Sequence, residues 1–154
     1  MVIDDSVCAA ITLLAKPPDE YAALEEALRD IIVPPDPFPA HISQAIIQLD
    51  HLHQQVYPLA VRAKAAYDNA SEILEEIMMS QGKGSNPTAM KADAARQAQI
   101  YDYHGMTVNL FELERAAKSR FTFYDGLMQA INQKHSRLIT LLGAHNLEAR
   151  LTPS

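Results

Sequence analysis

The longest hydrophobic pattern in this sequence runs from His41 to about Met79. Apolar residues recur there at alternating spacings of three and four, and they are Ile42, Ala45, Leu49, Leu52, Val56, Leu59, Ala63, Ala66, Ala70, Ile73 and Ile77. An unbroken repeat of this kind over five heptads predicts a long helix of the coiled-coil type. Pro58 lies inside the run and should kink the helix near residues 54–58, because proline removes a backbone hydrogen bond.

A second long helix is predicted after a break at residues 81–87. Gly82 is a natural helix C-cap, Asn86 an N-cap and Pro87 a first-turn proline. From there the helix is expected to continue to about Leu142, with Gly143 ending it. Its hydrophobic stripe consists of Tyr103, Met106, Leu110, Leu113, Ala117, Phe121, Tyr124, Met128, Ile131, His135, Leu138 and Leu142. No segment of six or more residues alternates between apolar and polar residues, so we predict no strand.

Prolines divide the first forty residues. The pattern predicts two short helices, at residues 6–15 and 19–33, and then a stiff connector with four prolines between Pro34 and Pro39. The fold class is therefore all-α: a long antiparallel helical hairpin of coiled-coil type with two short N-terminal helices. The expected division is residues 1–33 for the short helices, 34–40 for the connector, 41–146 for the hairpin and 147–154 for a flexible tail.

The two hydrophobic stripes give the expected packing surface. At 1.5 Å per residue the two long helices would span roughly 60 and 80 Å, so part of the longer one needs another partner. We therefore expect at least a dimer, and a close helix contact at the small residues Ala63, Ala66 and Ala70. The residues predicted for helix packing or oligomer contact are Leu49, Leu52, Val56, Ala63, Ala66, Ala70, Ile73, Leu110, Leu113, Ala117, Phe121 and Tyr124.

Charge restricts the class of partner. The chain has a net charge of -6, with histidines counted as neutral. Proteins that coat nucleic acid or an anionic membrane need a positive surface, so neither partner is expected. Cys8 is the only cysteine, so no intrachain disulfide is possible. The apolar run at residues 7–15 follows two aspartates and is too short to span a membrane, and we expect a cytoplasmic protein.

The charge is also unevenly divided along the chain. Residues 1–86 carry a net charge of -8 and residues 87–154 a net charge of +2. Arg115, Lys118 and Arg120 form the densest basic group, and an antiparallel turn at residues 81–87 would place them opposite residues 48–53, which include Asp50. Aromatic residues follow this group directly, as in sites for single-stranded nucleic acid. We favour packing and ion pairing for it, with partner recognition as the alternative.

No catalytic, metal-binding or cofactor-binding site is predicted. Lys83 lies between two glycines, but the other residues of a phosphate-binding loop are missing around it. His51 and His53 would point in nearly opposite directions on a helix. Glu72, Glu75 and Glu76 form an acidic patch without the second acidic pair that a magnesium site would need, which indicates a solvated helix face.

The sequence therefore favours a non-enzymatic structural or adaptor protein. It would self-associate through long amphipathic helices as part of a larger protein assembly. One alternative is an acidic accessory subunit or inhibitor of a nucleic-acid-processing complex. Another is an all-α enzyme with a site assembled between helices.

Overall fold

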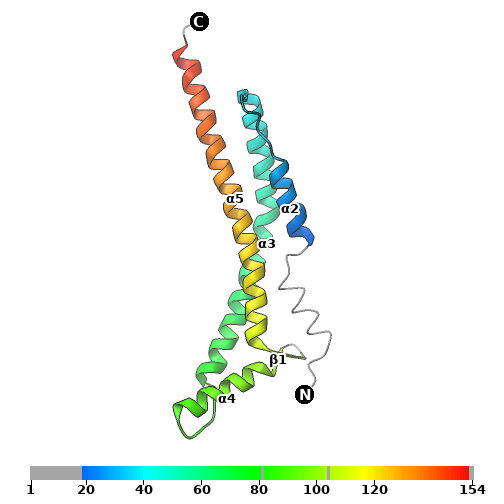
Figure 1. Ribbon diagram of the computed structural model, residues 1–154, viewed down its shortest axis with the longest axis vertical. Helices are drawn as coiled ribbons and strands as arrows, with labels where there is room; N and C mark the ends of the chain where they lie inside the picture. Colours follow the sequence, from blue (N-terminus) through cyan, green and yellow to red (C-terminus); the bar gives the residue numbers. More distant parts are fainter. Residues whose placement is uncertain (1–18, 81, 104, 153–154) are drawn as a thin grey trace. The chain divides into compact units, whose positions relative to one another are not determined.

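The computed structural model describes residues 19–80, 82–103 and 105–152 of this chain (Figure 1). The predicted helix at residues 6–15 lies outside the described residues. The elements, in order, are α2 (Asp19–Asp30), α3 (Pro39–Ser80), α4 (Pro87–Gln99), β1 (Tyr101–Tyr103), β2 (Met106–Val108) and α5 (Leu110–Leu151). The long helices α3 and α5 pack antiparallel, so the predicted all-α hairpin is confirmed.

The described chain divides into two compact units, and both long helices contribute to each. The three-helix unit consists of residues 19–60 and 124–152: α2, the first half of α3 and the second half of α5. The hairpin unit consists of residues 61–123: the second half of α3, α4, the β-hairpin and the start of α5.

The core of the three-helix unit lies between α3 and α5. Ile42, Leu49 and Val56 of α3 and Ile131 of α5 are almost completely buried. Tyr124 is buried as well, and its ring meets the edge of Tyr21 of α2 with centroids 6.1 Å apart. Ala45 and Leu52, which lie between these α3 residues, are buried as well, so the buried positions follow the predicted spacing of three and four. This confirms the first half of the hydrophobic pattern.

The C-terminal end of helix α2 is capped by a side chain of α5. None of its residues is buried. The ammonium group of Lys134 on α5 donates hydrogen bonds to the carbonyl oxygens of Ile31 and, at 3.2 Å, of Leu28. A helix leaves its last carbonyls without backbone partners and has a negative C-terminal end, so Lys134 acts as a tertiary cap for α2. Burial lowers the pKa of this ammonium group.

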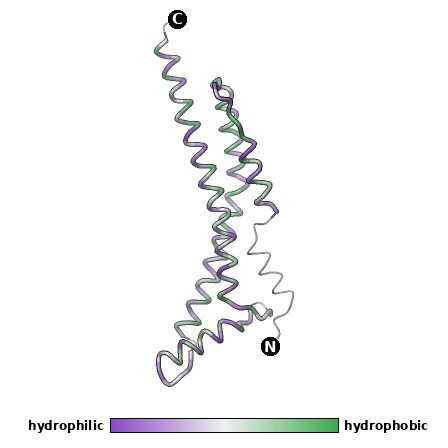
Figure 2. Tube along the Cα trace, in the orientation of Figure 1, coloured by the Kyte–Doolittle hydropathy of each residue, from purple (hydrophilic) through white to green (hydrophobic). Residues whose placement is uncertain are grey.

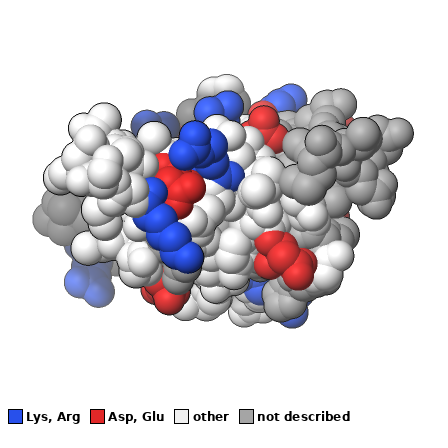
Figure 3. Space-filling model, turned by 90° about the horizontal axis from the view of Figure 1, so that it is seen from below, with Lys and Arg blue, Asp and Glu red and all other residues white. Residues whose placement is uncertain are grey.

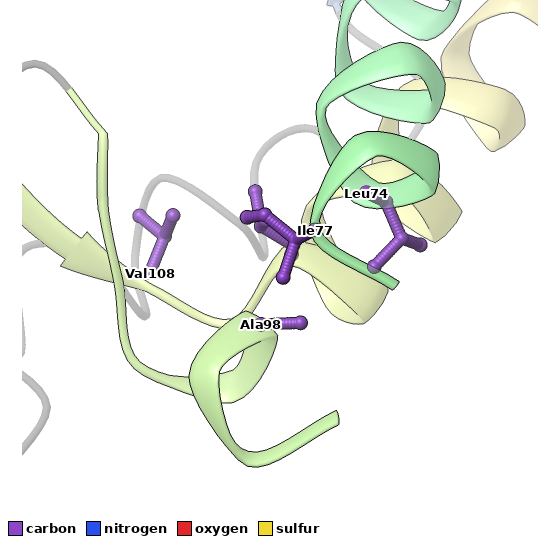
Figure 4. Close-up of a cluster of buried hydrophobic side chains, with 5 residues drawn as sticks. Leu74, Ile77, Ala98 and Val108 are labelled. Carbon is purple, nitrogen blue, oxygen red and sulfur yellow. The ribbon is translucent and has the colours of Figure 1, made fainter. Parts of the chain in front are cut away.

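The core of the hairpin unit brings together α3, α4 and the β-hairpin. Leu74 and Ile77 of α3, Ala98 of α4, Val108 of β2 and Leu110 of α5 form one buried cluster (Figure 4). Alanines at positions 94 and 98 are completely buried, so the α4 backbone lies close to its neighbours.

The β-hairpin corrects two predictions. The chain does contain strands, and the predicted last helix is interrupted between α4 and α5. Tyr101 pairs with Val108 and Tyr103 with Met106, and Gly105 takes a positive φ of 83° in the turn, which glycine adopts without strain. Each strand is only three residues long, so a search for six alternating residues could not find it.

The boundaries of α5 also differ from the prediction. Its start is marked by Asn109, whose side-chain oxygen accepts a hydrogen bond from the Phe111 N–H at 3.1 Å, as an N-cap does. Gly143 does not end the helix, which continues to Leu151. A glycine costs a helix about 1 kcal/mol relative to alanine, and that is too little to end it when helix-forming residues follow.

In the hairpin unit the buried face of α3 departs from the predicted repeat. Ala66 is exposed, and the neighbouring Tyr67 is half-buried with its ring stacked on Phe121 at 6.3 Å. Leu74 is likewise more deeply buried than Ile73. Ala63, Ala70 and Ile77 stay buried at the predicted spacing of seven. Only the position between them changes, from Ala66 to Tyr67 and from Ile73 to Leu74.

The connection from α3 to α4 is built around the predicted break. Asn86 caps α4 by accepting a hydrogen bond from the Ala89 N–H at 2.8 Å, and Pro87 occupies its first turn. The carboxylate of Asp93 reaches back from α4 and accepts the Lys83 N–H at 2.9 Å. It also accepts a hydrogen bond from the side chain of Gln97 at 2.9 Å. Asp93 therefore ties the connecting loop to α4.

We predict that Asp93 makes stability depend on pH. The backbone N–H of Lys83, and then the Gln97 side chain, hold the pKa of this carboxyl below its usual value. A lowered folded-state pKa stabilises the fold above the ordinary aspartate pKa, and this contribution disappears as the pH falls through the lowered value. Asp93→Asn should lower the melting temperature at neutral pH and flatten its decline in acid.

Asp125→Asn is the matched control for Asp93→Asn. Asp125 also accepts a hydrogen bond from a glutamine one turn later, Gln129, at 2.8 Å. No hydrogen bond from a loop N–H to Asp125 is found among the described residues. Thermal unfolding followed by circular dichroism between pH 2.5 and pH 7 compares the two variants. Equal melting curves for Asp93→Asn and the wild type at every pH would contradict the assigned role.

Candidate interaction surfaces

Large hydrophobic side chains lie exposed on both units. They are Ile32, Phe38, Ile47, Tyr57, Val61, Met79, Met90, Ile100, Ile139, Leu147 and Leu151. Figure 2 shows that hydrophobic and hydrophilic residues are mixed along the whole length of both long helices. Single exposed hydrophobic residues are normal on a protein surface. Here several of them lie near one another in the fold, which makes them candidates for protein contact.

One such group lies where α3 turns into α4. A hollow there is lined by Met78 and Met79 of α3, Gly82 of the loop, and Pro87, Met90 and Lys91 of α4. Methionine side chains are flexible and polarisable, so a surface rich in them can adapt to hydrophobic partners of different shape. The hollow is therefore suited to a hydrophobic side chain from another protein.

A second group lies on the connector between α2 and α3. Ile32 and Phe38 are strongly exposed, whereas their neighbours Ile31 and Pro37 are buried. The Phe38 N–H donates to Nδ1 of His41 at 3.3 Å, and the two rings lie in contact. The buried neighbours and this hydrogen bond fix the connector, so it presents two large hydrophobic side chains to solvent.

Most of the predicted interface residues pack within the chain. Leu49, Leu52, Val56, Ala63, Ala70, Leu110, Ala117 and Tyr124 are buried, and Ile73, Leu113 and Phe121 are half-buried. Ala66 is exposed, so a close contact at this alanine would have to come from a second chain. The role of these residues between chains stays a prediction. The exposed residues of the two surfaces described above were missed, because they lie outside the regular hydrophobic repeat.

Within one chain, the expected pairing of the basic cluster with Asp50 is wrong, whereas a pairing between two chains stays a prediction. Asp50 lies beside His135, with Oδ1 and Nε2 3.4 Å apart. The register differs because α4 and the β-hairpin lengthen the connection, whereas the predicted pairing requires a short turn. Arg115 and Lys118 are exposed and Arg120 is half-buried. No ion pair of these three residues with an acidic side chain is found within the described ranges.

Candidate sites for chemistry are few. Nowhere in the described part of the chain do three or more histidine, cysteine, aspartate or glutamate side chains gather in a way that could hold a metal ion. His53 stacks on the Tyr57 ring at 5.9 Å. A cavity of about 490 Å³ between α3, α4 and β1 is lined by Glu76 and Asp102 together with isoleucines. The two carboxylates beside hydrophobic residues could accept a basic side chain. The residues that line this cavity do not include a serine, cysteine or histidine that could act as a nucleophile with a neighbouring general base.

None of the helices in the described residues is long and apolar enough to cross a membrane. Comparisons with protein-family models, with curated proteins and with solved structures found no match for this chain.

Proposed function

We propose that this chain is a non-enzymatic structural or adaptor protein that self-associates through its long helices within a larger protein assembly. The observation that supports this proposal is the set of large hydrophobic side chains left exposed along α3 and α5. Covering apolar surface contributes about 25 cal/mol per Å², so several such side chains together give a strong tendency to associate.

The sequence suggests a dimer because the two long helices it predicts differ in length. That reason does not hold in the structure, because α3 and α5 each have 42 residues. The exposed hydrophobic residues take its place. They lie on both units and on surfaces that the packing of α3 against α5 leaves free, so association does not require the hairpin to open.

We predict that the protein is at least a dimer at micromolar concentration. Size-exclusion chromatography with light scattering over a hundredfold range of concentration measures the mass. A mass of at least two chains is expected, falling toward one chain only on dilution. The monomer mass of 17.1 kDa at every concentration would contradict the proposal.

An accessory subunit of a nucleic-acid-processing complex is the second candidate. It is favoured by the exposure of Arg115 and Lys118, which have no acidic partner among the described residues. Against it, the chain has a net charge of -6, and the face drawn in Figure 3 carries Asp and Glu as well as Lys and Arg side chains. A gel-shift assay at low and high salt, with wild type and Arg115→Glu/Lys118→Glu, tests it. Salt-sensitive binding that the reversal abolishes would favour this second function.

A further inference from the structure

The last part of α5, residues 139–151, is rich in hydrophobic side chains but contains no buried residue. Leu138 is the final buried position of the helix. Beyond it, Leu141 and Leu142 are half-buried, while Ile139, Leu147 and Leu151 are 48%, 58% and 72% exposed. An isolated helix of this length is marginal in water. Its hydrophobic residues on more than one side indicate a segment that packs against something further.

The exposed residues form a regular ridge. Ile139, Gly143, Leu147 and Leu151 follow one another at a spacing of four, so they lie along one line of the helix surface. We call this line the C-terminal ridge. Gly143 is its low point, and a Cβ added there would meet nothing within 4 Å. No contact with a residue that the structure describes therefore requires glycine at position 143, although glycine weakens the helix.

We propose that the C-terminal ridge packs antiparallel on the same ridge of a second copy of this chain, about a twofold axis. Leu147 of each copy would lie over Gly143 of the other, and Ile139 would lie beside Leu151. The ridge is self-complementary under this reversal, because a large residue meets the glycine gap and the two ends are both hydrophobic. This is the requirement for a twofold contact between identical surfaces. The inference rests on the proposed self-association and names the surface that carries it.

Charge also favours a second copy as the partner. Residues 139–151 contain one acidic residue, Glu148, and one basic residue, Arg150. Their net charge is zero, although the whole chain has -6. Two copies of this segment can therefore approach without the repulsion that other parts of an acidic chain would produce.

Paired glycine variants test the ridge. Gly143→Leu fills the low point and should raise the dissociation constant of the dimer at least tenfold, as should Leu147→Ala. Gly126→Leu is the matched control. Gly126 is also an exposed glycine of α5 with nothing within 4 Å of an added Cβ, and it lies outside residues 139–151. This control should leave the dissociation constant unchanged. Analytical ultracentrifugation measures all four proteins, and circular dichroism checks that each is folded.

Cysteine cross-linking tests the direction of pairing. In a Cys8→Ser background, Gly143→Cys and Leu147→Cys proteins are oxidised separately and as an equal mixture. The antiparallel ridge predicts disulfide formation mainly in the mixture, between position 143 of one copy and position 147 of the other. Efficient cross-linking of each variant to itself, but not to the other, would contradict it.

The outcomes separate the two proposals. A wild-type dimer whose dissociation constant is unchanged in Gly143→Leu and Leu147→Ala would overturn the ridge and leave self-association standing. A wild-type protein that is monomeric at every concentration would overturn both.

Discussion

Replacing Ile42 by alanine should lower the free energy of unfolding by about 2–5 kcal/mol, the usual cost of truncating a fully buried isoleucine. Ile42 is 0% exposed and lies in the first turns of α3, within the core of the three-helix unit. Part of the loss comes from the hydrophobic contacts of the removed methyl and methylene groups. The rest comes from the cavity that remains between helices which cannot close fully around it.

Ile47→Ala is the matched control for this change. It is the same substitution in the same helix and the same unit, but Ile47 is 56% exposed. A surface change of this kind should shift the free energy of unfolding by about 0.5 kcal/mol or less. Urea unfolding followed by circular dichroism compares the two variants at one protein concentration, because association would add to the apparent stability. Equal losses for both variants would mean that Ile42 does not lie in the core.

Gly82→Ala should cost about 1–3 kcal/mol, as overpacking a closely packed site does. A Cβ at position 82 would lie 2.0 Å from the carbonyl oxygen of Met90, which belongs to the α4 backbone. Such a contact forces the loop away from α4. The hydrogen bond between Lys83 and Asp93 then lengthens, and the hollow lined by Met79 and Met90 changes shape.

Gly126→Ala is the matched control. It is the same substitution, but we expect it to raise the stability of the protein instead of lowering it. Position 126 is in the middle of α5 and has open space around a Cβ, so alanine should stabilise the helix by about 1 kcal/mol. Thermal unfolding of both variants checks the pair. A melting temperature for Gly82→Ala equal to or above that of the wild type would contradict the close approach of α4.

The hydrophobic spacing predicted the parts of the fold that depend on one long regular helix. Ile42, Leu49 and Val56 are buried as the repeat requires, and Asn86 and Pro87 begin a helix where capping rules place one. These features follow from local geometry, since a side chain's position on a helix is fixed by its place in the sequence.

The sequence could not predict the features that depend on contacts between distant residues. Burial of Val108 against Ala98 and Ile77 stabilises a β-hairpin whose strands are too short to be recognised. Stacking of Tyr67 on Phe121 selects Tyr67 over Ala66 for the packed face. Capping rules assign Gly82 to a helix end because a capping glycine usually takes a positive φ. Among the described glycines, however, only Gly105 has a positive φ. The requirement for glycine at position 82 comes from the Met90 backbone, which no local rule reveals.

The candidate surfaces were harder to predict than the core for a related reason. Periodicity finds residues that face a partner within the chain, whereas Phe38, Met79 and Leu147 are notable because they are strongly exposed. Only the packed structure distinguishes an apolar residue that is covered from one that is not. Gly143 is an example, since the sequence predicts a helix end there and the structure places it within an exposed hydrophobic line.

The attachment of α2 through Lys134 has a consequence for the native-state dynamics. Because α2 has no buried residue and packs through half-buried side chains such as Tyr21, Leu24 and Leu28, we expect it to detach at a lower cost than global unfolding. In that partially open state the hydrophobic surface around Tyr124 and Leu138 would become accessible while α3 and α5 stay paired. Amide hydrogens of α2 should then exchange with solvent far faster than those in the middle of α5. A partner able to replace α2 would find its binding surface already formed.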